Sequence, residues 1–191
     1  MGTITVEQMV SVDGFAADAD GGLAFTAMAD FPDASRTDDS QMRWIAGIDA
    51  ILLGRVTYEM FAGYWPYADP AVEAVATPID ALPKHVVSST LARAPWGDAG
   101  AEAEVLRDGA IAAAKAMRER YAATVVWGSL QLTDALLAAG LVDELRLRIV
   151  PVAIGAGRAF TPAALGAQRL TLRDVERHET GHVTLTYGVG A

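Results

Sequence analysis

The sequence predicts one α/β domain, built on a mixed and mostly parallel sheet of about eight strands that ends in an antiparallel hairpin. The first indication is residues 123–151, which read as strand, glycine turn, helix and strand, the unit that builds parallel sheets. The second is a series of short apolar runs in the first half of the chain that end at small residues and alternate with helical patterns. The third is the alternation of apolar and polar residues over 170–177 and 182–189, with a turn at 179–181 between them.

The composition limits the classes of function. The chain has 191 residues, 52% of them hydrophobic, which suits a single domain over residues 1–191 with a substantial core. The net charge of −9 argues against non-specific binding to nucleic acids, which requires a basic surface. The sequence has no signal-peptide pattern, no apolar run long enough for a membrane span, and no cysteine. We therefore expect a cytoplasmic protein that binds a small molecule, without disulfides or thiolate metal sites.

The first element is a strand over residues 3–12, which we expect at the centre of the sheet because it is mostly apolar. It runs into Asp13, and residues 13–25 form a loop that is a candidate lid over a binding site. Residues 25–36 show no regular pattern, whereas residues 38–48 have the apolar spacing of a helix.

The next elements follow from apolar periodicity and from turn residues. Up to residue 88 we expect a strand over 50–53, a helix over 57–61, an aromatic turn over 63–66, a short helix over 70–79 and a strand over 84–88. A loop over 92–100, a strand over 103–106 and a helix over 108–121, capped by Asp108, follow. Farther along the chain, apolar residues alternate with Arg146 and Arg148 in a strand at 145–149, which leads into a loop over 151–157.

The segment 123–151 has the clearest local pattern. Its opening β-branched run is typical of a buried strand and ends at Gly128. Ser129 is a good N-cap for a helix that begins near Leu130 and stops at Gly140. Such a turn places backbone N–H groups at the positive end of a helix, where an anion such as a phosphate can bind.

Two further turns have the same position after a predicted strand. In the first, Gly54 precedes Arg55, which could bind a phosphate, and Thr57, which could cap the helix and donate to the same anion. In the second, Ser88-Ser89-Thr90 places small hydroxyl groups at a strand end. Each turn alone is more typical of a structural role. Together with the turn at Gly128 they could hold a dinucleotide, because ligands of open α/β sheets collect at the carboxyl edge.

Two carboxylates are the candidates for chemistry. Asp13 ends the predicted central strand, and Asp38 opens a helix, where it could equally be an N-cap. Asp39 could take either part in place of Asp38.

Two other motifs have structural interpretations. His178-Glu179-Thr180-Gly181-His182 fits the H-E-x-x-H zinc pattern, but that pattern requires a helix, and this segment lies between two alternating runs. We therefore predict a hairpin turn there, and no metal site. Gly155-Ala156-Gly157 lacks the third glycine and the helix of a dinucleotide fingerprint. It predicts a tight turn, with close approach of its backbone to a ligand as the alternative.

Five short motifs occur in one order along the chain: Val10 to Phe15, Leu53 to Glu59, Val87 to Leu91, Gly128-Ser129 with Gly140 to Leu145, and Pro151 to Phe160. This series resembles the dihydrofolate-reductase-like superfamily, and within it the stand-alone relatives of the reductase domain of riboflavin biosynthesis. The resemblance covers nearly the whole chain. It implies a three-layer fold of the dihydrofolate reductase type, NADPH as the hydride donor and a homodimer.

The resemblance also implies roles for single residues. Arg55 and Thr57, after Gly54, match the turn that holds the cofactor's phosphates in the family. Ser88 and Ser89 match the serine pair on the adenosine-phosphate side. The pyrophosphate turn is matched by Gly128, Ser129 and Leu130.

The match departs from the family at that last turn, and it leaves the substrate open. The usual double glycine is reduced to Gly128, preceded by the large Trp127. Asp13 matches the aspartate that lies beside the substrate in riboflavin reductases, and Asp38 falls where true dihydrofolate reductases place their substrate-binding carboxylate. The resemblance implies an NADPH-dependent reductase of a pyrimidine- or pterin-like substrate, similar to the 5-amino-6-(5-phosphoribosylamino)uracil reductases. The alternatives are a dihydrofolate reductase proper and a non-catalytic nucleotide-binding dimer.

Overall fold

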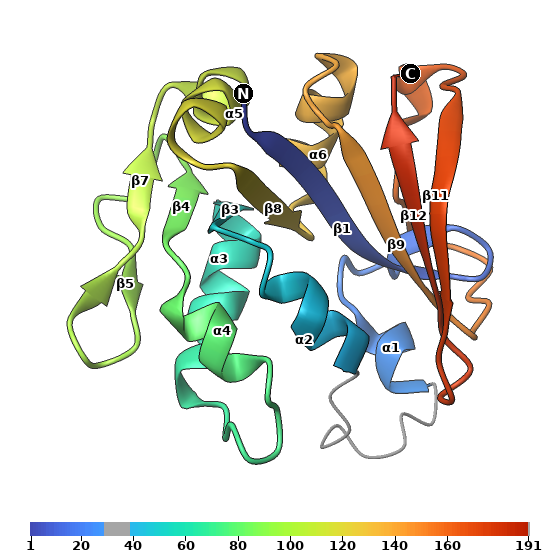
Figure 1. The fold of residues 1–191 in the computed structure, drawn as a ribbon, viewed down its shortest axis with the longest axis horizontal. Helices are drawn as coiled ribbons and strands as arrows, with labels where there is room; N and C mark the ends of the chain where they lie inside the picture. Colours follow the sequence, from blue (N-terminus) through green and yellow to red (C-terminus); the bar gives the residue numbers. More distant parts are fainter. Residues whose placement is uncertain (29–38, 191) are drawn as a thin grey trace.

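The computed structural model of the chain describes residues 1–28 and 39–190. An eight-stranded sheet forms its centre (Figure 1), in the order β11-β12-β9-β1-β8-β3-β4-β7. The strands are β1 (Thr3–Ser11), β3 (Ala50–Gly54), β4 (Lys84–Val87), β7 (Glu104–Leu106), β8 (Ala123–Trp127), β9 (Glu144–Val150), β11 (Leu170–Arg177) and β12 (Val183–Val189). Two small ladders pair β2 (Phe15–Ala17) with β10 (Arg158–Ala159) and β5 (Pro95–Trp96) with β6 (Ala101–Glu102).

The topology confirms the predicted mixed sheet. Strand β1 is central and pairs in parallel with β8 on one side and β9 on the other. The pairs β8–β3, β3–β4 and β4–β7 are also parallel, whereas β12 is antiparallel to both β9 and β11. The residues 178–182 turn between β11 and β12, and the N–H of His178 donates to the carbonyl of His182 at 3.0 Å. The H-E-x-x-H segment is therefore a hairpin turn, as predicted.

Helices cover both faces of the sheet, in three layers (Figure 1). On one face, α5 (Gly109–Arg120) and α6 (Leu130–Ala138) pack on the side chains of β1 and β8 that point to this face, among them Val6 and Val126. On the other face lie α2 (Asp39–Ile45), α3 (Arg55–Ala62) and α4 (Ala76–Ala81), which pack on Val125 and Trp127. The remaining helical elements are α1 (Ala24–Met28), η1 (Trp65–Tyr67) and η2 (Ala163–Leu165). Because successive residues of a strand point to opposite faces, each central strand contributes to both cores.

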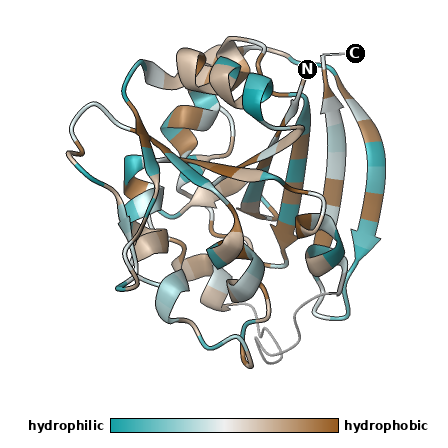
Figure 2. Ribbon diagram, turned by 60° about the vertical axis from the view of Figure 1, so that its left-hand side comes forward, coloured by the Kyte–Doolittle hydropathy of each residue, from teal (hydrophilic) through white to brown (hydrophobic). Residues whose placement is uncertain are grey.

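The outer strands differ from this buried centre. Figure 2 shows hydrophilic and hydrophobic residues alternating along the edge strand β11, most of which is exposed. Among the helices of the described residues, none has the length and apolar content of a membrane span.

Several element boundaries differ from the prediction. The helix expected at 57–61 begins at Arg55, with Gly54 as its N-cap. The helix expected over 70–79 is confined to α4, and the loop expected over 92–100 contains β5. Residues 25–28 lie in α1 although no regular pattern was recognised there, and residues 29–36 lie outside the described residues. Boundaries are set by tertiary pairing and packing, which local patterns report poorly.

One buried cation, Lys84, is the first residue of β4, and the attraction of the nearby Asp80 carboxylate offsets only part of the effect of its burial. Lys84 is 8% exposed, its Nζ donates to the carbonyl of Asp80 at 2.5 Å, and it lies 4.4 Å from the centre of the Trp96 ring. Burial lowers the pKa of Lys84 from 10.5 to about 8. The positive charge of buried Lys84 therefore lowers the free energy of unfolding at neutral pH.

We expect Lys84→Met to raise the free energy of unfolding by about 1 kcal/mol near pH 7, the relief from the buried charge being partly offset by the lost hydrogen bond and ring contact. Between the folded pKa of about 8 and the unfolded value of 10.5, the unfolded wild-type chain binds more protons, so wild-type stability rises with pH. The advantage of the variant should therefore shrink above pH 8. Urea unfolding at both ends of that window measures it, and a constant difference would contradict the assignment.

Candidate ligand-binding site

A cavity of about 1270 Å³ opens at the carboxyl ends of the parallel strands. Its walls come from the ends of β1, β8, β3 and β4, from the first turns of α3 and α6, and from α1 and α2. All eight residues that the sequence suggested for binding a dinucleotide line it: Gly54, Arg55, Thr57, Ser88, Ser89, Gly128, Ser129 and Leu130. The three turns thus meet at one edge of the sheet, which is the arrangement expected from their positions after neighbouring strands.

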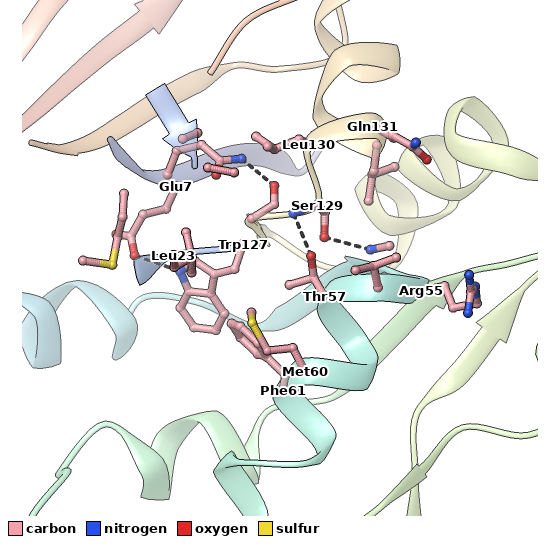
Figure 3. Close-up of a pocket in the computed structure, with 18 of the residues that line it drawn as sticks. Glu7, Leu23, Arg55, Thr57, Met60, Phe61, Trp127, Ser129, Leu130 and Gln131 are labelled. Carbon is pink, nitrogen blue, oxygen red and sulfur yellow. Dashed lines mark hydrogen bonds between the residues drawn. The ribbon is translucent and has the colours of Figure 1, made fainter. Parts of the chain in front are cut away.

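Two hydrogen bonds join the first turns of α3 and α6 (Figure 3). The N–H of Ser129 donates to Thr57 Oγ1 at 2.9 Å, and the N–H of Gly54 donates to Ser129 Oγ at 2.9 Å. The sequence suggested that Thr57 and Ser129 would each cap its own helix. Ser129 does occupy the N-cap position of α6, as predicted, whereas the N-cap of α3 is Gly54 and not Thr57. Neither helix has a side-chain cap hydrogen bond, and the two hydroxyl groups instead link one helix to the other.

The backbone before α6 has an unusual conformation. Gly128 and Ser129 have φ values of 53° and 52°, in the left-handed region. The carbonyl of Gly128 accepts hydrogen bonds from Thr133 Oγ1 at 3.2 Å and from the amide of Gln8, which fixes the turn. A Cβ atom at Gly128 would lie 3.3 Å from two side-chain atoms of Thr57. The turn therefore keeps the first N–H groups of α6 at the cavity wall, where the positive ends of two helices favour an anion.

Two arginines extend this anion-binding end. Arg55 is about half exposed and donates to Glu59 Oε1 at 2.8 Å within α3. Arg107, which the sequence analysis did not single out, lines the same cavity and donates to the carbonyl of Leu91 at 2.6 Å. A guanidinium has five N–H donors, so both side chains have donors left for a phosphate. Arg107 is the better candidate for binding a phosphate, because the carbonyl of Leu91 leaves its charge uncompensated, whereas Glu59 compensates that of Arg55.

The serine turn after β4 lines the same cavity as these arginines. Ser88 Oγ accepts hydrogen bonds from the backbone N–H groups of Thr90 at 3.2 Å and Leu91 at 3.1 Å. Ser88 therefore shapes the loop, while the exposed Ser89 and Thr90 also line the cavity. Both have hydroxyl groups that can donate to a phosphate.

The opposite end of the cavity is aromatic. Trp127 packs against Phe61, with the ring centres 6.0 Å apart, and against Trp44 at 6.3 Å. Figure 3 shows the rings of Trp127 and Phe61 together with Met60, away from Arg55 and beyond the joined turns. The bulk of Trp127 is thus directed into this cluster, which leaves the Gly128 backbone at the cavity wall.

A row of buried polar side chains lies beneath the aromatic end. Glu7 on β1 is in register with Trp127 on β8 and with Arg146 on β9. Its Oε1 accepts from Trp127 Nε1 at 2.8 Å and from Gln41 Nε2 at 3.0 Å, and its Oε2 accepts from Arg146. The sequence analysis missed this row. The alternation around Arg146 predicted its strand correctly, but no local signal shows that both faces of that strand are covered.

Asp13, one of the two proposed catalytic carboxylates, lies outside the set of cavity-lining residues. Its carboxylate accepts hydrogen bonds from Ser11 Oγ at 2.6 Å and from the N–H groups of Gly155 at 2.7 Å and Ile154 at 3.2 Å. The Ser11 hydroxyl and then the Gly155 N–H hold the pKa of Asp13 below its usual value. Asp13 thus joins the loop after β1 to the loop after β9 by hydrogen bonds, and its catalytic role stays a prediction. The other candidate, Asp38, lies outside the described residues.

The loops that Asp13 joins form one side of the cavity. The short ladder of β2 and β10 holds residues 13–25 against the loop after β9, and Ala16, Ala17 and Leu23 line the cavity. A Cβ atom at Gly157 would lie 2.2 Å from the carbonyl oxygen of Ala17. The backbone of the glycine loop at 155–157 therefore approaches this neighbouring loop closely, and neither Gly155 nor Gly157 lines the cavity, so the alternative of a ligand-contacting backbone is not supported.

The sequence and the fold both resemble those of known proteins. A sequence profile of the RibD C-terminal domain matches residues 2–185. No curated protein matches the chain. A solved structure of a protein assigned to riboflavin biosynthesis in Shewanella sp. PV-4 has a TM-score of 0.78 at 17% identity, with 99% of each chain covered.

Two other solved structures share the fold. A pyrimidine reductase-like protein from Corynebacterium diphtheriae has a TM-score of 0.67 at 17% identity, covering 100% of this chain and 92% of its own. Dihydrofolate reductase from Enterococcus faecalis, in complex with NADP(H) and RAB-propyl, has a TM-score of 0.58 at 15% identity, covering 100% of this chain and 98% of its own. At these identities the likeness shows the fold, which is the dihydrofolate-reductase-like fold that the sequence motifs implied.

Proposed function

This chain belongs to the RibD C-terminal domain family, and from that membership we propose that it is an NADPH-dependent reductase that transfers a hydride to a small heterocycle of the pyrimidine or pterin type. The family is one of reductases, so an oxidoreductase activity follows from the membership. NADPH and the class of substrate are the parts that we propose.

One observation supports the proposal above the others. The first turns of α3 and α6 meet at a single cavity that has two arginines at one end and an aromatic cluster at the other. The first end suits the phosphates of a dinucleotide, and the second suits planar rings. A cavity of about 1270 Å³ is larger than common sites for a single small ligand, which suits a dinucleotide together with a second ring.

The roles of the residues follow from their positions. The N–H groups at the start of α6 and the side chains of Arg55 and Arg107 would hold the phosphates, and Ser89 would add a hydroxyl donor. NADPH supplies the hydride when it is bound. The chain itself orients the two rings at the aromatic end and keeps water away from them. The carboxylate that would steer the proton stays a prediction for Asp13 and Asp38, of which Asp13 is engaged by two backbone N–H groups.

The proposal is tested by titrating the protein with NADPH and then following the loss of NADPH absorbance with pyrimidine, pterin and quinone substrates. We expect saturable binding and oxidation with a pyrimidine or pterin. Binding without oxidation across the panel would favour a non-catalytic nucleotide-binding protein, and tight methotrexate binding would favour a dihydrofolate reductase proper. A lack of NADPH binding would overturn the proposal. A homodimer and a cytoplasmic location stay predictions.

A further inference from the structure

A buried carboxylate lies at the aromatic end of the cavity, and it is neither of the acids that the sequence suggested. Glu7 is 5% exposed and lines the cavity from the middle of β1. Among the described residues of the cavity wall, the other carboxylate is that of Glu73, which accepts a hydrogen bond from the hydroxyl of Tyr64. Figure 3 places Glu7 beside Trp127 and far from Arg55, so it faces the end opposite to the proposed phosphate site.

The orientation of this carboxylate is fixed from three sides. Trp127 and Gln41 donate to Oε1, and Arg146 donates to Oε2. Arg146 is 1% exposed, and its guanidinium carbon lies 4.5 Å from the centre of the Trp44 ring. The holding residues come from β8, β9 and α2, so that two layers of the fold set the position of one functional group.

A contribution to the stability of the fold does not by itself explain why a charged carboxylate is buried at this position. Buried ion pairs are commonly no more stabilising than apolar residues of similar volume, and they are costly when one partner is lost. The carboxylate has about four lone-pair positions, and its donors are three side chains, of which Gln41 Nε2 is shared between Oε1 at 3.0 Å and Oε2 at 3.4 Å. A ligand N–H can replace the longer of the two Gln41 contacts. The flat rings of Trp127 and Phe61 beside it favour a planar partner.

We propose that Glu7 determines which substrate ring is accepted, by receiving hydrogen bonds from N–H groups along the edge of a planar nitrogen heterocycle. Gln41 and Arg146 act as positioning residues that hold the carboxylate toward the cavity. A ring edge with two amino groups is preferred over one on which a single N–H lies between two carbonyl oxygens, because the lone pairs of those oxygens would face those of the carboxylate. This inference rests on the proposed function, since it concerns the substrate end of the same site.

Two bicyclic probes of nearly equal size test the proposal, 2,4-diaminoquinazoline and quinazoline-2,4-dione. Their affinities are measured by calorimetry on the protein saturated with NADP+, and NADPH affinity is measured separately. We expect the wild type to bind the diamine at least about tenfold more tightly than the dione, which is the effect of one hydrogen bond to a charged group. Glu7→Gln should remove most of that preference by weakening the diamine, with NADPH affinity unchanged.

Two further variants separate recognition from folding. Glu176→Gln is the matched control, because Glu176 Oε1 lies 3.7 Å from the same Arg146 guanidinium but does not line the cavity. It should leave the preference unchanged. If Glu7→Gln does not fold, Gln41→Leu loosens the carboxylate and should reduce the preference by at least about threefold.

The outcomes distinguish this inference from the proposed function. A wild-type protein that binds NADPH but shows no preference for the diamine overturns the role of Glu7 alone. An equal loss for both probes in Glu7→Gln also overturns it, because a purely structural role would affect both rings alike. Failure to bind NADPH overturns the proposed function itself.

Discussion

Arg146→Met is expected to lower the free energy of unfolding by about 3–5 kcal/mol, because it leaves the buried carboxylate of Glu7 without its cation. Methionine approximates the length of the arginine side chain, so that little of the loss comes from an empty cavity. The contact with the Trp44 ring is changed as well, but such contacts contribute less than a buried charge. Urea unfolding followed by circular dichroism measures the change.

The double variant Glu7→Leu/Arg146→Met is the control for this prediction. It removes both charges, and it should recover most of the stability that Arg146→Met loses, because apolar residues can replace a buried ion pair with little cost. A single variant that loses less than about 1 kcal/mol would contradict the prediction, since a loss that small is typical of exposed ion pairs.

Removal of the two arginines at the phosphate end of the cavity, Arg55 and Arg107, should change the preference between the two nicotinamide cofactors. Arg55→Ala and Arg107→Ala are each expected to weaken NADPH binding about tenfold or more, and the double variant by about 100- to 1000-fold, because a phosphate loses its charge-assisted donors. NADH lacks the 2′-phosphate and should be affected much less. We expect Arg107→Ala to have the larger effect, because Arg55 must leave Glu59 to bind a phosphate.

Fluorescence titration with each cofactor measures these effects. Arg93→Ala serves as the control, because Arg93 is an exposed arginine paired with Glu102 that does not line the cavity. Equal losses of NADPH and NADH affinity in the two cavity variants would show that the arginines contact the pyrophosphate that both cofactors share, and would refute their role in discrimination.

The phosphate end of the site could be predicted from sequence because its signals are local. Gly54 and Gly128 each follow an apolar strand and precede a helix, and parallel strands bring such turns to one edge. Arg55 and Ser88 followed from these positions. Arg107 was missed although Gly109 follows it at the start of α5, because the short edge strand β7 before it has little of the apolar pattern that marks the other turns.

The ring end could not be predicted, because its contacts join residues far apart in the chain. Glu7 meets Trp127 and Arg146 at separations of 120 and 139 residues, and their register is fixed only once β8, β1 and β9 have paired. The hydrogen bonds of the Thr57 and Ser129 hydroxyl groups were predicted wrongly for the same reason. Capping is a local rule, whereas the bond between Ser129 and Thr57 spans 72 residues.

The division of the cavity between loops and strands has a consequence for how readily the protein can be re-engineered. The arginines at the phosphate end are surface side chains on a helix start and a loop, so selection for a different nucleotide can proceed through single exchanges there. The carboxylate at the other end is embedded in three strands, and any exchange of it disturbs partners in two layers. Libraries aimed at new substrates should therefore diversify the lining positions at Leu23 and Thr26, whose neighbourhood is more open, and keep Glu7 and Arg146 constant.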